Sequence, residues 1–164
     1  QLSDEKLSLE KIGTTLSMHI RVQHWRIAAE GWRQRPLLGW GPDAFHTLSV
    51  DDVCAWRTAR GEPCDRERYT TAPHAHSLYV STLVERGVLG LLALAVLLGT
   101  WAWTLLRSAA SAAQSPLWVA SAASLAVVVV GGLFNTTLRV EHGSLALLWF
   151  ALWVAADRRA RTAR

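Results

Sequence analysis

Three uncharged apolar runs dominate the second half of the chain, at residues 88–106, 117–134 and 143–156. A helix of the first run's nineteen residues, at 1.5 Å per residue, spans roughly the ~30 Å hydrocarbon core of a bilayer. The third run has fourteen residues, and we expect it to cross with help from its flanks. The alternative, core helices of a soluble domain, fits the lengths less well. The pattern therefore predicts three transmembrane helices.

The placement of arginine predicts the orientation of these helices. Residues 157–164 form a basic tail, and cytoplasmic flanks carry the excess of Lys and Arg. With the tail inside, three spans place residues 1–87 outside, in the periplasm of a Gram-negative host. The chain opens on a polar stretch without a signal peptide. We therefore expect an all-α polytopic membrane protein, seen as a C-terminal fragment that begins inside a large periplasmic loop.

The outer region, residues 1–87, contains one predicted amphipathic helix at about 17–34. Pro36 ends it, and its apolar positions recur at helical spacing: Met18, Val22, Trp25, Ala29 and Trp32. Such a helix suits a membrane interface, or packs on the transmembrane helices. Residues 36–45 are punctuated by Gly and Pro and predict a turn. Residues 43–69 predict a loop with short helical pieces at most.

Charge and cysteine content narrow the function classes. The net charge of +4 lies wholly after residue 87, chiefly in the tail, so no basic face for nucleic acid is expected. Cys54 and Cys64 are the only cysteines. A disulfide between them would pin a loop in an oxidising compartment. A zinc site with His46 or His74 is the less favoured alternative, because no CxxC pair occurs.

Two histidines stand just before the first apolar run. A helix that starts near Pro73 or His74 would carry Leu78, Leu83 and Val84 inward, and would place Gly87 and Gly90 on one face for close helix approach. His74 and His76 would then lie at the water–membrane boundary. Histidine is the side chain that takes a proton near neutral pH. The alternative for each is a solvated surface residue. Trp101 and Trp103 are expected in an aromatic belt at the inner end of the span.

Two motifs resemble the O-antigen ligase family. His76-Ser77, nine further residues and then Gly87-x-x-Gly90 is similar to that family's H-[NSQ]-x9-G-x-x-[GTY] signature. Upstream, Arg21-x3-Trp25 is followed by the PLLGWG stretch, which contains Gly39 and Gly41, and by Phe45. The order of the motifs, the variable loop between them and the apolar spans after them all fit the resemblance.

The resemblance implies a metal-independent glycosyltransferase without a cofactor, located in the bacterial inner membrane with its active site facing the periplasm. Its donor would be a glycan on undecaprenyl diphosphate, and its acceptor a hydroxyl of lipid A–core. No DxD motif or P-loop occurs, so neither a nucleotide-sugar donor nor ATP is expected. The partners are these two glycolipids and membrane lipid.

The residue types suit that chemistry. His76 would act as the general base, and Arg21 would stabilise the charge of the departing diphosphate. Arg26 and Arg139 are further candidates for binding the diphosphate; Arg139 could equally be an interfacial anchor paired with Glu141. A single displacement without a carboxylate nucleophile would invert the anomeric configuration.

Three readings stay open at this point. The first is the ligase. The second is an O-antigen polymerase or a protein O-oligosaccharyltransferase of the same superfamily. The third is a non-catalytic membrane component such as a transporter subunit, which would be expected to carry ionisable groups within its spans, whereas these spans have none.

Overall fold

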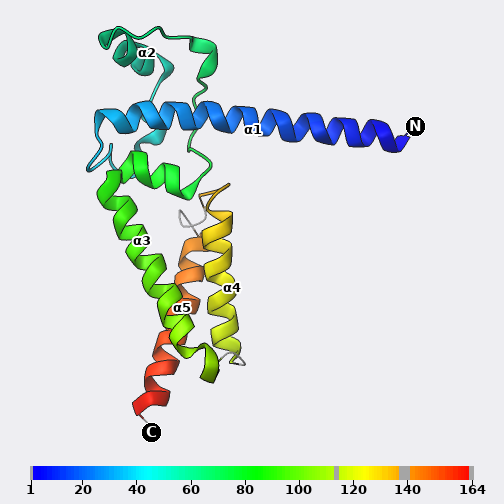
Figure 1. Cartoon of the computed structure of the whole chain (residues 1–164), viewed down its shortest axis with the longest axis vertical. Coiled ribbons are helices and arrows are strands. Elements are labelled where there is room, and N and C mark those ends of the chain that lie inside the picture. The colour runs from blue at the N-terminus through cyan, green and yellow to red at the C-terminus, as the bar shows by residue number, and fades with distance from the viewer. Residues whose placement is uncertain (1, 113–114, 137–140, 163–164) are drawn as a thin grey trace.

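The computed structural model describes residues 2–112, 115–136 and 141–162, and over these residues it is all-helical, as expected. Helix α1 lies across one end of a bundle formed by α3, α4 and α5, and α2 lies on the opposite side of α1 (Figure 1). The elements in chain order are α1 (Leu2–Gln34), η1 (Ala44–Thr47), α2 (Val50–Ala59), η2 (Arg66–Arg68), α3 (Leu78–Ala112), α4 (Pro116–Gly131) and α5 (Glu141–Thr162).

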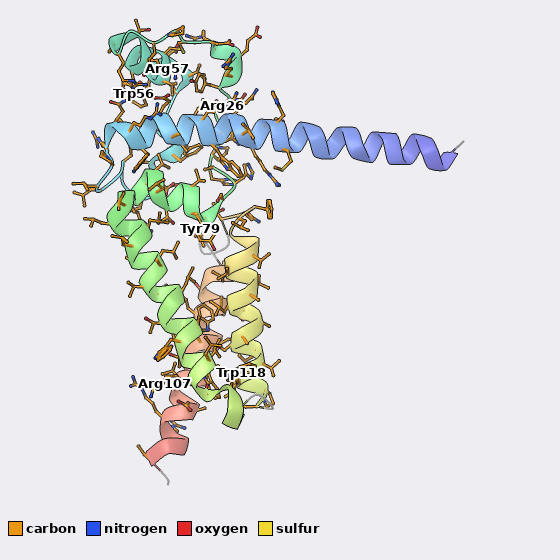
Figure 2. The ribbon with its side chains drawn as sticks, in the orientation of Figure 1. Arg26, Trp56, Arg57, Tyr79, Arg107 and Trp118 are labelled. Carbon is orange, nitrogen blue, oxygen red and sulfur yellow. A yellow bond between two sulfur atoms is a disulfide. The ribbon has the colours of Figure 1, made fainter. Side chains whose placement is uncertain are left out.

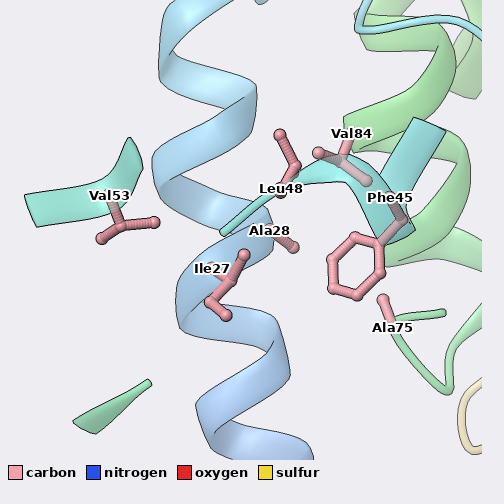
Figure 3. Close-up of a cluster of buried hydrophobic side chains, with 7 residues drawn as sticks. All are labelled: Ile27, Ala28, Phe45, Leu48, Val53, Ala75 and Val84. Atoms are coloured by element: carbon pink, nitrogen blue, oxygen red, sulfur yellow. The ribbon is translucent and has the colours of Figure 1, made fainter. Parts of the chain in front are cut away.

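Helix α1 is longer than predicted and buries a different face. It starts at Leu2, so the polar opening of the chain continues the helix. The predicted apolar stripe was wrong as the packing face, since Met18 is 43% exposed and Ala29 is exposed, whereas Ile27 is 1% exposed. The reason is that α1 packs between α2 and α3, and the residues facing both are buried even where they are polar. The resulting core unites three parts of the chain: Ile27, Ala28, Phe45, Leu48, Val53, Ala75 and Val84 (Figure 3).

The segment at residues 43–69, predicted as a loop with short helical pieces, contains the ten-residue helix α2. Ser49 and Asp52 form a reciprocal capping box that starts α2, with each side chain bonded to the other's backbone N–H. A disulfide joins Cys54 of α2 to Cys64 in the segment that follows. The carboxylate of Glu30 on α1 is 6% exposed and accepts hydrogen bonds from Arg57 (3.0 Å) and Arg60 (2.6 Å). These links attach α2 firmly to α1.

Among the described residues, one helix is long and apolar enough to cross a membrane, Leu78–Ala109 within α3. It contains the predicted span 88–106. Helix α4 is apolar but ends at Gly131, short of the predicted boundary at 134. Helix α5 runs to Thr162, so most of the basic tail continues a helix instead of forming a separate element. The second and third crossings stay predictions.

Helix α3 also begins later than expected and is not continuous. It starts at Leu78 and breaks at Gly87, whose φ of 65° lies outside the helical region. Trp101 is fully buried, donates a hydrogen bond to the hydroxyl of Ser121 on α4 at 2.9 Å and stacks on Phe150 of α5. The expectation of an aromatic-belt position was therefore wrong for Trp101, because its indole ties the three helices together.

Candidate active site

Three histidines meet where α1 passes the start of α3. The ring of His76 stacks on that of His24 from α1, with ring centroids 5.5 Å apart. The ring of His74 meets His76 edge-on, with centroids 4.2 Å apart. Among the described residues, no group of three His, Cys, Asp or Glu side chains is arranged to ligate a metal ion. The cluster is therefore one of ring contacts around His76.

The backbone around His76 is fixed on both sides. His76 has a φ of 51°, a left-handed conformation that is uncommon outside glycine and that persists where its surroundings determine it. On one side, the indole N–H of Trp25 donates to the carbonyl of Ala75 at 2.8 Å. On the other, the hydroxyl of Ser77 donates to the carbonyl of Gly132 at 3.2 Å, and the N–H of Leu78 donates to the same carbonyl at 2.8 Å. His76 is thus held between α1 and the end of α4.

Arg21 lies on α1, three positions before His24. It precedes Trp25 by one helical turn, so the two residues share a face of α1. Its positive charge acts on His76 and disfavours the protonated imidazole. The expected joint role of Arg21 and His76 stays a prediction, which this electrostatic interaction supports.

The imidazole of His76 is shifted toward its neutral form. Burial lowers the pKa of His76 below its ordinary value, and the neighbouring His74, His24 and Arg21 lower it further by charge repulsion. Burial, and then His74, likewise lowers the pKa of His24. A neutral imidazole is the form that accepts a proton, so the site favours a base at position 76.

The two glycine-containing motifs meet at the bend of α3. The break at Gly87 frees carbonyls before it and N–H groups after it, and the loop following α1 bonds both. The N–H of Trp40 donates to Val84 at 3.1 Å, and that of Gly41 donates to Glu85 at 2.8 Å. In the other direction, Val88 donates to Pro36 at 2.9 Å and Leu89 to Leu37 at 3.2 Å.

Glycine is required at two positions of this junction. Gly39 has a φ of 69°, and a Cβ there would overlap the backbone of Glu85 and Arg86. Gly87 has a φ of 65°, and a Cβ there would overlap the backbone of Leu37. The predicted role of Gly87 in helix–helix approach was wrong, because it meets the loop after α1. We call this junction the elbow.

A cavity of about 410 Å³ lies beside the elbow. Its lining is polar near the bend and apolar further along α3, and Gly90 gives room for the stem of Arg86. Leu78, two residues after His76, also lines it. The residues that line this elbow cavity include Ser81, Thr82, Glu85, Arg86, Ala93, Leu94, Leu97 and Leu147. An amphipathic ligand matches this change of polarity.

Of the two further arginines expected to bind the diphosphate, the structure describes Arg26. Arg26 is five residues beyond Arg21, about 140° around the helix at 3.6 residues per turn. Arg26 lies on the side of α1 toward α2 (Figure 2). There it lines a separate cavity, together with Arg33. Its expected role in binding the diphosphate stays a prediction. Arg139 lies outside the described residues, so the structure does not place it. Gly41 has a φ of 106° and open space around it, which is compatible with its place in the loop.

Two residues of the site were missed from the sequence. His24 follows Arg21 by three positions, and that i,i+3 spacing on one helix face was the available signal. Arg86 adjoins Gly87 of the second motif, but its direction became visible only once the bend in α3 was known. The sequence places His74 two positions before His76, and the two rings are in contact.

Comparison with known proteins supports the pairing of the two motifs. Searches of curated proteins and of solved structures found no significant match. The family model described as O-antigen ligase matches residues 3–95, which include Arg21, Trp25, His76, Gly87 and both segments of the elbow. The match covers more than half of the chain, which therefore belongs to the O-antigen ligase family.

Proposed function

We propose that this chain carries the active site of an O-antigen ligase, which moves a glycan from undecaprenyl diphosphate to a hydroxyl of lipid A–core. The observation that supports the proposal is the His76 imidazole, which stacks on His24 of α1 and is held toward its neutral form by burial and by the charges of His74, His24 and Arg21. Family membership supports a reaction on lipid-linked glycans in general. The choice of ligase over its sister enzymes follows the signature around His76.

The proposed reaction is a single displacement. The acceptor oxygen attacks the anomeric carbon of the glycan while its proton passes to the imidazole of His76. The bond from that carbon to the diphosphate oxygen breaks, and the lipid diphosphate leaves with the electron pair. Attack from the side opposite the leaving group inverts the anomeric configuration. Arg21 stabilises the charge on the leaving diphosphate, which is most valuable as that charge develops.

The elbow cavity supports a location for the donor lipid. Its apolar part lies along the candidate membrane span, and its polar part lies at the bend. We place the first isoprenoid units against Leu94 and Leu97, and the diphosphate between Arg86 and Arg21. In this arrangement the enzyme lies in the bacterial inner membrane with His76 on the periplasmic side, and needs no metal or cofactor.

A complementation assay tests the proposal. His76→Ala and Arg21→Ala, made in the full-length protein, are expressed in a ligase-null strain, and lipopolysaccharide is separated on a gel. Each variant is expected to lose the O-antigen ladder while its amount in the membrane is unchanged. The matched controls are His46→Ala and Arg66→Ala, both exposed outside the site, which are expected to keep the ladder.

Two outcomes would contradict the proposal. A normal ladder from both site variants would remove their catalytic assignment. The unmodified protein could fail to restore the ladder in the ligase-null strain and yet restore chain length in a polymerase-null strain or glycosylate protein. In that case the proposed acceptor is wrong, and the chain belongs to a polymerase or a protein O-oligosaccharyltransferase. Failure to act in every strain would favour a non-catalytic membrane component.

A further inference from the structure

A second cavity, of about 480 Å³, lies between α1, α2 and the segment that follows α2. Figure 1 shows that α2 is on the side of α1 away from the helical bundle. The cavity falls within the ~300–1,000 Å³ typical of small-ligand pockets. Four guanidinium groups from three parts of the chain line it: Arg26, Arg33, Arg57 and Arg68. We call it the arginine cavity.

Positive charge in the arginine cavity exceeds the negative charge present. Two carboxylates, Glu30 and Asp65, face the four arginines. Glu30 pairs with Arg33 (3.3 Å), with Arg57 (3.0 Å) and, outside the lining, with Arg60 (2.6 Å). Arg57 pairs also with Glu62, outside the lining, at 3.1 Å. Asp65 pairs with Arg68 at 2.9 Å.

Arg26 differs from the other three arginines. It makes no hydrogen bond or ion pair within the described part of the chain and is exposed. With Arg60 and Glu62 included, five arginines face three carboxylates, so among the described residues two guanidinium charges are left over, one of them on Arg26. A cluster of this kind attracts an anion, which guanidinium groups bind through paired hydrogen bonds.

The wall of the arginine cavity is preorganised by hydrogen bonds within the chain. The Nε of Arg57 donates to the carbonyl of Pro63 at 3.0 Å, next to the disulfide at Cys64. The amide of Gln23 on α1 donates to the carbonyl of Glu67 at 3.1 Å. These bonds hold the segment after α2 against α1, so a ligand does not have to order it, and less binding free energy is lost.

We propose that the arginine cavity binds an anionic saccharide, one that bears a carboxylate or a phosphate. The arginines would hold the anionic group, and the aromatic side chain of Tyr69, which is also in the lining, would contact a sugar ring. This inference rests on the proposed function for its saccharide, because a glycan transferase handles long sugar chains outside its reacting centre. The cavity would hold such a chain on the far side of α1 from His76, where it fixes the orientation of the glycan and selects for acidic substituents.

Calorimetric titration of the intact chain in detergent tests the inference. The probes are trigalacturonate, glucose 6-phosphate and, as the neutral control, maltotriose. Trigalacturonate carries carboxylates and glucose 6-phosphate carries a phosphate, so comparing their affinities shows which anionic group the cavity prefers. At least one of them is expected to bind more tightly than maltotriose. Arg26→Gln and Arg68→Gln are each expected to weaken that binding about tenfold, the usual effect of one charge-assisted hydrogen bond. Arg66→Gln, an exposed arginine outside the cavity, is the control and is expected to leave it unchanged.

Equal affinity for maltotriose and both anions would overturn the inference, and so would wild-type affinity in the Arg26→Gln/Arg68→Gln double variant. The titrations are repeated with His76→Ala, which should lose transfer but keep binding. Arginine-dependent binding in an unmodified protein that transfers no glycan would contradict the proposed function and support this inference. Normal glycan transfer by a protein that does not bind the anions would support the proposed function and contradict this inference.

Discussion

The indole N–H of Trp25 reaches across from α1 and donates to the carbonyl of Ala75, 50 positions later in the chain, at 2.8 Å. One residue on is His76, in a left-handed conformation, and one helical turn before Trp25 is Arg21. A single hydrogen bond therefore connects the helix that carries the guanidinium to the backbone that carries the imidazole. This bond sets the relative position of the two groups in the proposed mechanism.

Removing that hydrogen bond should impair transfer more than folding. Trp25→Phe keeps most of the ring but leaves the Ala75 carbonyl without its donor, a change worth about 1–3 kcal/mol. We expect transfer to fall about tenfold or more with the membrane level unchanged. Trp32→Phe, which removes an exposed bond to Pro36, is the matched control. Equal rates for the two variants would show that Trp25 does not position His76.

The pH dependence of transfer should reflect the lowered pKa of His76. The base works when neutral, so the rate falls as the pH drops through that pKa. Because the pKa is lowered, this acid limb lies below the ordinary histidine value of about 6.5. His74→Gln removes one charge that lowers the pKa, so the limb should move to higher pH. His46→Gln should leave it in place. A limb that stays fixed or moves lower in His74→Gln would contradict the assignment.

The elbow should not tolerate a side chain at its glycines. Gly39→Ala and Gly87→Ala each place a Cβ into opposing backbone at a positive φ, and the conformation alone costs about 1–2 kcal/mol. Both variants are expected to accumulate poorly in membranes and to unfold at lower temperature in detergent. Gly99→Ala, with open space around it, should behave as the wild type. A wild-type unfolding temperature for Gly87→Ala would show that the bend is not needed.

The disulfide should stabilise the outer part of the chain. Cys54 and Cys64 are ten positions apart, and closing a loop of that size contributes about 3 kcal/mol in the chain-entropy account. Cys54→Ser/Cys64→Ser should lower the unfolding temperature followed by tryptophan fluorescence, with Trp56 of α2 as a nearby reporter. Dithiothreitol should lower it in the wild type but not in the variant. If neither the double variant nor dithiothreitol treatment of the wild type lowers the unfolding temperature, the disulfide does not stabilise this part of the chain.

The parts of the fold that depend on local composition could be predicted from the sequence. The apolar run at 88–106 lies within the one candidate span of the described residues. The buried face of α1 could not be predicted from its apolar period. His24 and Glu30 are buried because they have partners from other elements, so hydrophobicity alone selected a rotated face.

The elbow could not be predicted, because it is made by segments that are distant in the chain. The spacing of Gly87 and Gly90 fits a continuous helix equally well. Only the hydrogen bonds from Trp40 and Gly41 to the end of the first helical piece show why the chain bends there. The pairing of Arg21 with His76 came from resemblance to a family, since neither residue carries a local signal for the other.

The most direct test of the account measures two quantities on the same purified enzyme, the rate of glycan transfer and the Kd of the lipid-linked donor. His76→Ala is expected to lower the rate by at least about 10²-fold, the usual contribution of a general base, and to leave the Kd unchanged. Arg21→Ala is expected to weaken donor binding and to lower the rate. A wild-type rate in His76→Ala, at any donor affinity, would contradict the account.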